Sequence, residues 1–161
     1  MKFKFTTIFA FLAAITLSYS SVSAKNIKVQ ASSKAGDWAH KFMTEQYAPR
    51  LKAMTGGSLS LTVLPTKAVV PHRETIDAVA NGILDGDLNA ISYFAGRDPA
   101  FAIIGDLIAG YDTPDQLQSY CMVGGGKEML QKIYDSLKVT AGKLKVIGCS
   151  SYSREALVSK K

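Results

Sequence analysis

Apolar residues at every second position mark two short strands near the start of the chain. Residues 27–31 alternate between apolar and polar side chains, and residues 59–63 repeat the same pattern. Between them, residues 37–54 carry large apolar side chains three and four positions apart, which predicts a long amphipathic helix. Pro49 lies inside this helix, and because proline cannot donate the usual backbone hydrogen bond, we expect a kink there.

The stretch from Val69 to Asp87 predicts a second helix that leads directly into a third strand. Pro71 suits the first turn of a helix, where its missing N–H costs nothing, and apolar residues follow it at helical spacing. Gly82 closes this helix, and the apolar run at residues 88–92 then predicts a short strand. Tyr93 follows that run, so we expect it at the carboxyl end of the strand.

Two further helices and a fourth strand are predicted in the second half of the chain. Thr113 and Pro114 form a capped, proline-led helix start, and the glycines at 124–126 break that helix. Residues 130–137 have the spacing of another amphipathic helix, and residues 144–149 that of an apolar strand. This alternation favours an α/β domain with a mostly parallel sheet flanked by helices. Ligands of such domains bind beyond the carboxyl ends of the strands.

Residues 1–24 have the composition of an export signal. Two lysines precede an apolar run at residues 5–17, and small residues follow before position 25. A membrane anchor is disfavoured, because this run is shorter than the roughly 20 residues that span a bilayer. We expect cleavage after Ala24, a periplasmic location, and one domain formed by residues 25–161.

The net charge and the number of cysteines limit which partners and which disulfide bonds we expect for this chain. The formal net charge is +6, but the basic residues are scattered and form no dense tract, so nucleic acid is not expected as a partner. Cys121 and Cys149 are too few for a disulfide framework, and each lies among apolar residues. We expect both to be buried and unbridged. A disulfide, which export to an oxidising compartment would permit, is the less favoured alternative.

The sequence shows no set of reactive residues typical of an enzyme. His40 and His72 have no obvious partners, and no HExxH or CxxC spacing supports a metal site. The run from Gly148 to Tyr152 approaches a serine elbow, but tyrosine replaces its second glycine. A small exported hydrolase that uses Ser150 or Cys149 is therefore an alternative and not the main hypothesis.

Two aspartates flank Gly86 and invite comparison with a catalytic carboxylate pair. Asp85 and Asp87 are alternate residues of a predicted strand, so their side chains point the same way. We interpret them as a solvated strand start. Asp77 would similarly lie on the polar face of the preceding helix.

Polar residues that follow predicted strands are suited to hold a small ligand. The candidates are Ser33 after the first strand, Tyr93 after the third, and Tyr152 and Arg154 after the last. A guanidinium can grip a carboxylate through two parallel hydrogen bonds, so the natural ligand is an organic anion. The alternatives are that Arg154 is a solvated loop residue and that Tyr93 packs against the sheet.

The order of several short motifs resembles a known family of receptors. These motifs are Met54-Thr55-Gly56-Gly57, Ala68-Val69-Val70-Pro71, Ile76-Asp77-Ala78-Val79-Ala80-Asn81-Gly82, Leu84-Asp85-Gly86, Ser92 to Phe101, and Gly124-Gly125-Gly126. Together they resemble the DctP-type solute-receptor subunit of tripartite ATP-independent periplasmic (TRAP) transporters, in the branch that binds 2-oxo acids and other monocarboxylates. The resemblance covers essentially all of residues 25–161.

The resemblance implies a type II periplasmic-binding-protein fold whose two domains close over a small organic anion such as a 2-oxo acid. It further implies a membrane permease as partner, no catalysis, and no cofactor other than a sodium ion beside the ligand in full-length members. Members continue past Lys161 into a second domain that carries the main carboxylate-binding arginine. We therefore expect the N-terminal portion of a receptor without its second domain, or, as an alternative, a truncated remnant that binds nothing.

Overall fold

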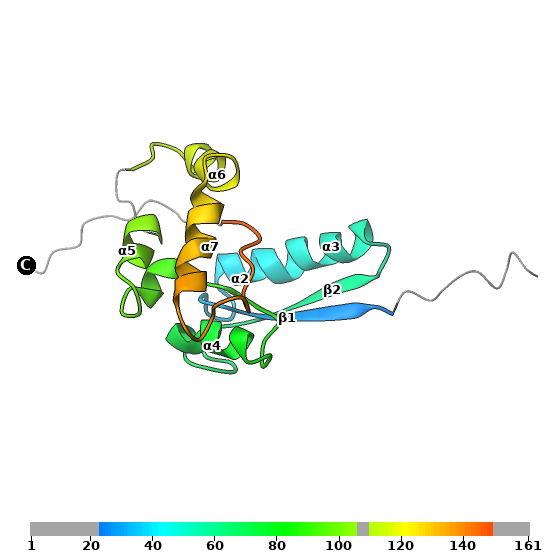
Figure 1. Ribbon diagram of the computed structural model, residues 1–161. Helices are drawn as coiled ribbons and strands as arrows, with labels where there is room; N and C mark the ends of the chain where they lie inside the picture. The colour runs from blue at the N-terminus through cyan, green and yellow to red at the C-terminus, as the bar shows by residue number, and fades with distance from the viewer. Residues whose placement is uncertain (1–22, 106–109, 150–161) are drawn as a thin grey trace, which may run out of the picture.

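The computed structural model describes residues 23–105 and 110–149 (Figure 1). Three parallel strands form a sheet in the order β2-β1-β3: β1 (Lys25–Ala31), β2 (Leu59–Leu64) and β3 (Gly86–Leu88). None of the helices in these two ranges is long and apolar enough to cross a membrane. The expected parallel sheet flanked by helices is confirmed.

The first two strands lie where the alternation of side chains predicts them, but the third differs. Strand β3 ends at Leu88, whose carbonyl accepts a hydrogen bond from the Ser32 N–H, and residues 91–94 form the 3₁₀ helix η3 (Ile91–Phe94). The prediction of a strand through residue 92 was therefore wrong. The chain turns there because Phe94 is buried, with its ring edge-on to that of Phe101 in the core.

The long first helix is present, and Pro49 is accommodated by a change in helix type. Helix α2 (Trp38–Lys41) continues as the π-helix η1 (Phe42–Tyr47) and then as α3 (Ala48–Met54), which packs on β2. The wider π-helical turn lies immediately before the proline, which has no N–H to donate. Where the sequence predicted a kink, the structure has a local widening.

The second helix begins after Pro71 as expected, but it is short. A 3₁₀ turn, η2 (His72–Glu74), leads into α4 (Thr75–Ala80), and Gly82 ends the turn that follows with a φ of 73°. Figure 1 shows α3 and α4 on opposite sides of the sheet.

Three more helices gather near the carboxyl ends of the strands (Figure 1). They are α5 (Ala100–Gly105), α6 (Pro114–Met122) and α7 (Gly126–Ser136). The predicted start of α6 is confirmed, because the Thr113 hydroxyl accepts a hydrogen bond from the Gln116 N–H. Gly125 precedes α7 in a left-handed conformation, with a φ of 89°. The main core cluster joins α4, η3, α5 and α7 through Ile76, Phe94, Phe101, Leu130, Ile133 and Tyr134.

Two expectations for the end of the described chain were wrong. Residues 144–149 are extended but form no strand, because no neighbouring strand pairs with them within the described ranges. Cys121 is buried as expected, yet it forms a disulfide with Cys149, with 6.1 Å between the two Cα atoms. The sequence shows that each cysteine has apolar neighbours, but it does not show that the fold brings the end of α6 to this segment.

Candidate functional site

The carboxyl ends of the three strands bring polar residues to one edge of the sheet. Ser33 follows β1, and its carbonyl accepts a hydrogen bond of 2.8 Å from the N–H of Thr66, which follows β2. On the other side of β1, Asn89 follows β3. Ser33 is half-buried between these two neighbours.

Gln30, the penultimate residue of β1, fixes the loop that leads into η2. Its side chain is fully buried, and its Nε2 donates to the Val70 carbonyl at 2.7 Å. Its Oε1 accepts from the N–H groups of Val69 at 2.8 Å and of Val70 at 3.2 Å. One buried amide thus satisfies three backbone groups and holds the start of η2 against the sheet.

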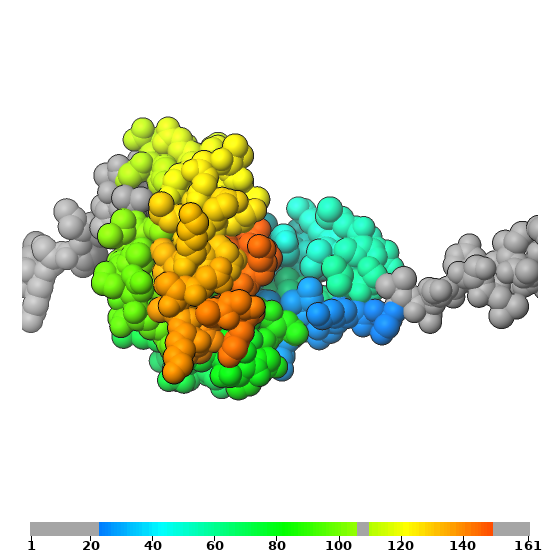
Figure 2. Space-filling view, viewed as in Figure 1, coloured from blue at the N-terminus to red at the C-terminus, as the bar shows by residue number. Residues whose placement is uncertain are grey.

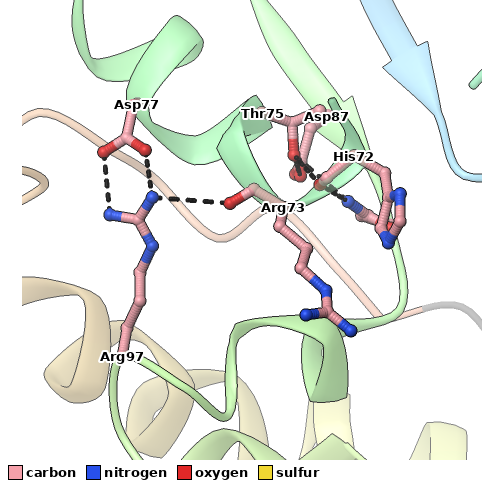
Figure 3. A network of polar contacts seen from close by, with 7 residues as sticks. His72, Arg73, Thr75, Asp77, Asp87 and Arg97 are labelled. Atoms are coloured by element: carbon pink, nitrogen blue, oxygen red, sulfur yellow. Dashed lines mark hydrogen bonds and ion pairs between the residues drawn. The ribbon is translucent and has the colours of Figure 1, made fainter. Parts of the chain in front are cut away.

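A polar network connects η2 and α4 to the end of β3 (Figure 3). The Thr75 hydroxyl donates to Asp87 Oδ2 at 2.7 Å, and Asn89 Nδ2 donates to the His72 carbonyl at 2.6 Å. The same Asn89 nitrogen lies 3.1 Å from the Thr75 hydroxyl. Burial raises the pKa of the Asp87 carboxyl, and the hydrogen bonds from Thr75 and Asn89 oppose that shift.

This network corrects the interpretation of the two aspartates as a solvated strand start. Asp85 is exposed, as expected, and accepts a hydrogen bond from the Lys28 N–H at 2.8 Å. Asp87 instead turns inward toward Thr75.

Tyr93 lies at this edge but belongs to η3 and not to a strand. Its side chain is 44 % exposed, and its ring meets that of His72 edge-on, with 4.7 Å between the ring centroids. The structure therefore does not show the alternative arrangement, in which Tyr93 packs against the sheet. Because η2 and η3 are in contact, His72 brings its neighbour Arg73 to the same part of the surface.

The arginines nearest this edge have different partners. Arg97 forms an ion pair with Asp77 through both of its terminal nitrogens, and it also donates to the Arg73 carbonyl (Figure 3). Asp77 does lie on the polar face of its helix, but it is occupied by this pair. Arg73 is exposed, and within the described residues its guanidinium has no carboxylate partner.

The predicted site residues are therefore only partly placed by the structure. Ser33 and Tyr93 lie at the same carboxyl edge, with different immediate neighbours. Tyr152 and Arg154 lie outside the described residues. Sequence reasoning missed His72 and Arg73, although the position directly after Pro71 at a helix start was a signal that they would sit near the ends of the strands.

The chemistry available at this edge is that of binding by hydroxyl, imidazole and guanidinium groups. Within residues 23–105 and 110–149, no three side chains of the histidine, cysteine, aspartate or glutamate type come together as metal ligands.

Comparison with known sequences identifies a receptor relative. No family model matches the chain. The chain is 30% identical, over 95 residues, to a monocarboxylate 2-oxoacid-binding periplasmic protein of Nostoc sp.. This match covers 59% of the chain and 26% of the relative.

Solved structures agree with that relative. A TRAP periplasmic solute-binding protein from Rhodobacter sphaeroides, in an open form without ligand, matches 68% of the chain with a TM-score of 0.64 and 32% identity. A second, from Pseudoalteromonas atlantica with bound sodium and pyruvate, matches 70% of the chain with a TM-score of 0.58 and 19% identity, and so supports the fold alone.

The chain spans only part of these proteins. It covers 34% of each of the two solved chains and about a quarter of the curated relative. The resemblance inferred from the motifs is confirmed: in sequence and in fold the chain is similar to part of a TRAP solute-binding protein.

Proposed function

We propose that this chain is the N-terminal portion of a periplasmic solute receptor that captures a small organic carboxylate, such as a 2-oxo acid, for a TRAP transporter. The observation that carries the proposal is the carboxyl edge of the sheet. There Ser33 follows β1, while His72 contacts Tyr93 where η2 meets η3, and Arg73 is the next residue after His72. The 2-oxo acid is suggested by the Nostoc relative, which is a 2-oxoacid-binding protein, and by the pyruvate bound to the Pseudoalteromonas protein.

Each residue at the edge has a distinct role in this proposal. The Tyr93 and Ser33 hydroxyls donate hydrogen bonds to the acid, and the Arg73 guanidinium faces its carboxylate. Tyr152 and Arg154 remain proposed ligand contacts from the sequence alone. Arg97 is not assigned a role in binding, because Asp77 already occupies its guanidinium.

One wall of a cleft supports only weak binding. A carboxylate that stays in water gains about 0 to 1 kcal/mol from a single exposed arginine. Tight capture needs a second domain that closes over the ligand and excludes water. We therefore expect a Kd of about 1 mM or weaker for residues 25–161 alone.

The proposal is one of binding without catalysis. The relatives are named as solute-binding proteins. Cys149 is bonded to Cys121, and a disulfide sulfur offers no thiolate nucleophile. The hydrolase alternative would then rest on Ser150, which lies outside the described residues.

The same proposal includes a cellular location, a membrane partner and a bound ion for the receptor. Residues 1–24 act as the export signal, residues 25–161 form the receptor domain, and the membrane permease subunits receive the ligand. A disulfide supports a periplasmic location, because such bonds persist in oxidising compartments. Sodium and pyruvate are both bound in the Pseudoalteromonas protein, and this supports an ion in the complete receptor.

The direct test is an NMR titration of residues 25–161 with pyruvate and, as a matched control, with its uncharged methyl ester. We expect pyruvate to shift the resonances of His72 and Tyr93 and the ester to leave them unchanged. If neither pyruvate nor other small acids shift them, the chain is a non-binding remnant. Specific labelling of Ser150 by a serine-directed covalent probe, together with ester turnover, would favour the hydrolase.

A further inference from the structure

The segment at residues 144–149 is extended although it has no neighbouring strand. Leu144 and Val146 are half-buried against the core cluster, whereas Lys145 and Ile147 are exposed. This alternation is that of a strand with one face toward a core. Within the described residues, however, the segment belongs to no sheet.

Side-chain amides replace the missing strand neighbour. On α7, Gln131 Nε2 donates to the Leu144 carbonyl at 3.0 Å, and its Oε1 accepts from the Val146 N–H at 2.9 Å. On α6, Gln118 Nε2 donates to the Cys149 carbonyl at 2.8 Å. All three hydrogen bonds are only part-buried, so water competes for each of them.

The far end of the segment has one covalent attachment. Cys149 is bonded to Cys121, which is fully buried in the last turn of α6. Gln118 lies one helical turn earlier on α6, so the helix holds the end of the segment by one hydrogen bond and one disulfide.

The segment forms one wall of a cavity of about 460 Å³. The facing walls come from β3 and from Leu130 and Tyr134 of α7, and the lining is mostly apolar. Figure 2 shows this last described part of the chain, in orange, between α7 and the cyan helix of the N-terminal half. The cavity is already partly open to solvent, and more of its apolar lining is exposed if this wall moves away.

We propose that the Cys121–Cys149 disulfide is a redox-sensitive bond that holds residues 144–149 in place. While it is intact, it keeps residues 144–149 in place as one wall of the cavity; when it is reduced, the segment detaches and the sheet with its helices stays folded. The three amide hydrogen bonds guide the segment to its place but do not hold it there alone. This proposal does not depend on which ligand the carboxyl edge binds.

The chemical step is thiol–disulfide exchange with a dithiol reductant. A thiolate of the reductant attacks one of the two sulfurs and forms a mixed disulfide, and the second thiol of the reductant then displaces the protein. Cys121 and Cys149 become thiols, and the reductant becomes its cyclic disulfide. Two electrons and two protons pass to the protein. Access favours attack at Cys149, because it is half-buried and Cys121 is fully buried.

The test compares oxidised and dithiol-reduced protein, purified from the periplasm, by hydrogen–deuterium exchange. We expect the amide of Val146, whose N–H is the one in residues 144–149 that donates a hydrogen bond within the described residues, to exchange about tenfold faster or more after reduction, while β1 and β2 are unchanged. The fluorescence of an apolar dye should rise as the cavity opens. Cys121→Ser/Cys149→Ser should behave like reduced protein and should not respond to the dithiol. Gln131→Ala in oxidised protein removes the acceptor of the Val146 N–H, so it should accelerate exchange at Val146 but leave the dye fluorescence unchanged.

Several outcomes would overturn the proposal. Two free thiols in protein purified without reductant would show that the bond does not form. Equal exchange of the Val146 amide before and after reduction would show that the bond does not hold residues 144–149. Faster exchange throughout β1 and β2 would show that the disulfide stabilises the whole fold. A rise in dye fluorescence in oxidised Gln131→Ala as large as the rise on reduction would show that the Gln131 amide, and not the disulfide, holds the segment.

Discussion

The ring of His72 meets the ring of Tyr93 edge-on, with their centroids 4.7 Å apart. This contact joins η2 to η3 at the carboxyl edge of the sheet, and the His72 carbonyl is at the same time held by Asn89. An edge-on aromatic pair restricts the orientation of both rings. Tyr93 therefore presents its exposed side to solvent from a defined position. Arg73 is the residue directly after His72, the partner of Tyr93.

Arg73→Ala should weaken pyruvate binding about three- to fivefold, which corresponds to the loss of an exposed charge interaction worth up to about 1 kcal/mol. Arg50→Ala removes the same charge from an exposed position on α3, where Arg50 contacts Gln46, and should leave binding unchanged. NMR titration measures both. Equal losses in the two variants would show a general effect of net charge and would remove Arg73 from the site.

Gln30→Leu should lower the free energy of unfolding by about 1 to 3 kcal/mol, because it removes the partner of three part-buried backbone groups of Val69 and Val70. Urea unfolding followed by circular dichroism measures the loss. Gln46→Leu is the matched control, since Gln46 is exposed on η1, and it should change stability little. A Gln30→Leu variant as stable as wild type would mean that this amide does not hold the loop.

The sequence predicted those helices and strands whose positions are set by residues close together in the chain. The alternation in residues 27–31 and 59–63 placed β1 and β2, and Thr113 with Pro114 placed the start of α6. Residues 144–149 form an apolar run without this alternation, since Val146 and Ile147 are both apolar, although burial alternates from Leu144 to Ile147. They form no strand because a strand also needs a neighbour, and the pattern within one segment does not show whether a neighbour exists.

The candidate site was predictable only as a region. The rule that ligands bind beyond the carboxyl ends of parallel strands pointed to Ser33 and Tyr93, and both follow strands at that edge, but their contact with a ligand stays a prediction. The contact of Tyr93 with His72 and the inward turn of Asp87 arise from the packing of η2 and α4 against β3. The Cys121–Cys149 bond is likewise a tertiary contact, and spacing along the chain does not specify it.

Asp87 should make the protein less stable at neutral pH than in mild acid. Its native pKa is raised by burial above the ordinary 3.8, so between these two values the folded state binds more protons than the unfolded state. The free energy of unfolding therefore falls as pH rises from about 4 through the raised pKa, and it stays lower above that value.

Asp87→Asn removes this contribution, while its amide oxygen can still accept the Thr75 hydrogen bond. The stability of the variant relative to wild type should accordingly be higher at pH 7 than at pH 4, as measured by urea unfolding at both values. Asp85→Asn, at an exposed position, is the control. A relative stability that is the same at both pH values, or higher at pH 4, would contradict the burial of an ionised Asp87.

Loss of the disulfide should also lower global stability, even though the native sheet persists without it. The bond links residues 28 positions apart, and closing a loop of that length in the unfolded chain raises the free energy of unfolding by about 3 to 4 kcal/mol. Cys121→Ser/Cys149→Ser should lose this amount in urea unfolding, and reduced wild type should match it. Because the bond is absent from the variant, a dithiol should not shift its midpoint further. Equal midpoints for oxidised wild type and the variant would show that the bond does not constrain the unfolded chain, whatever it does to residues 144–149 in the folded one.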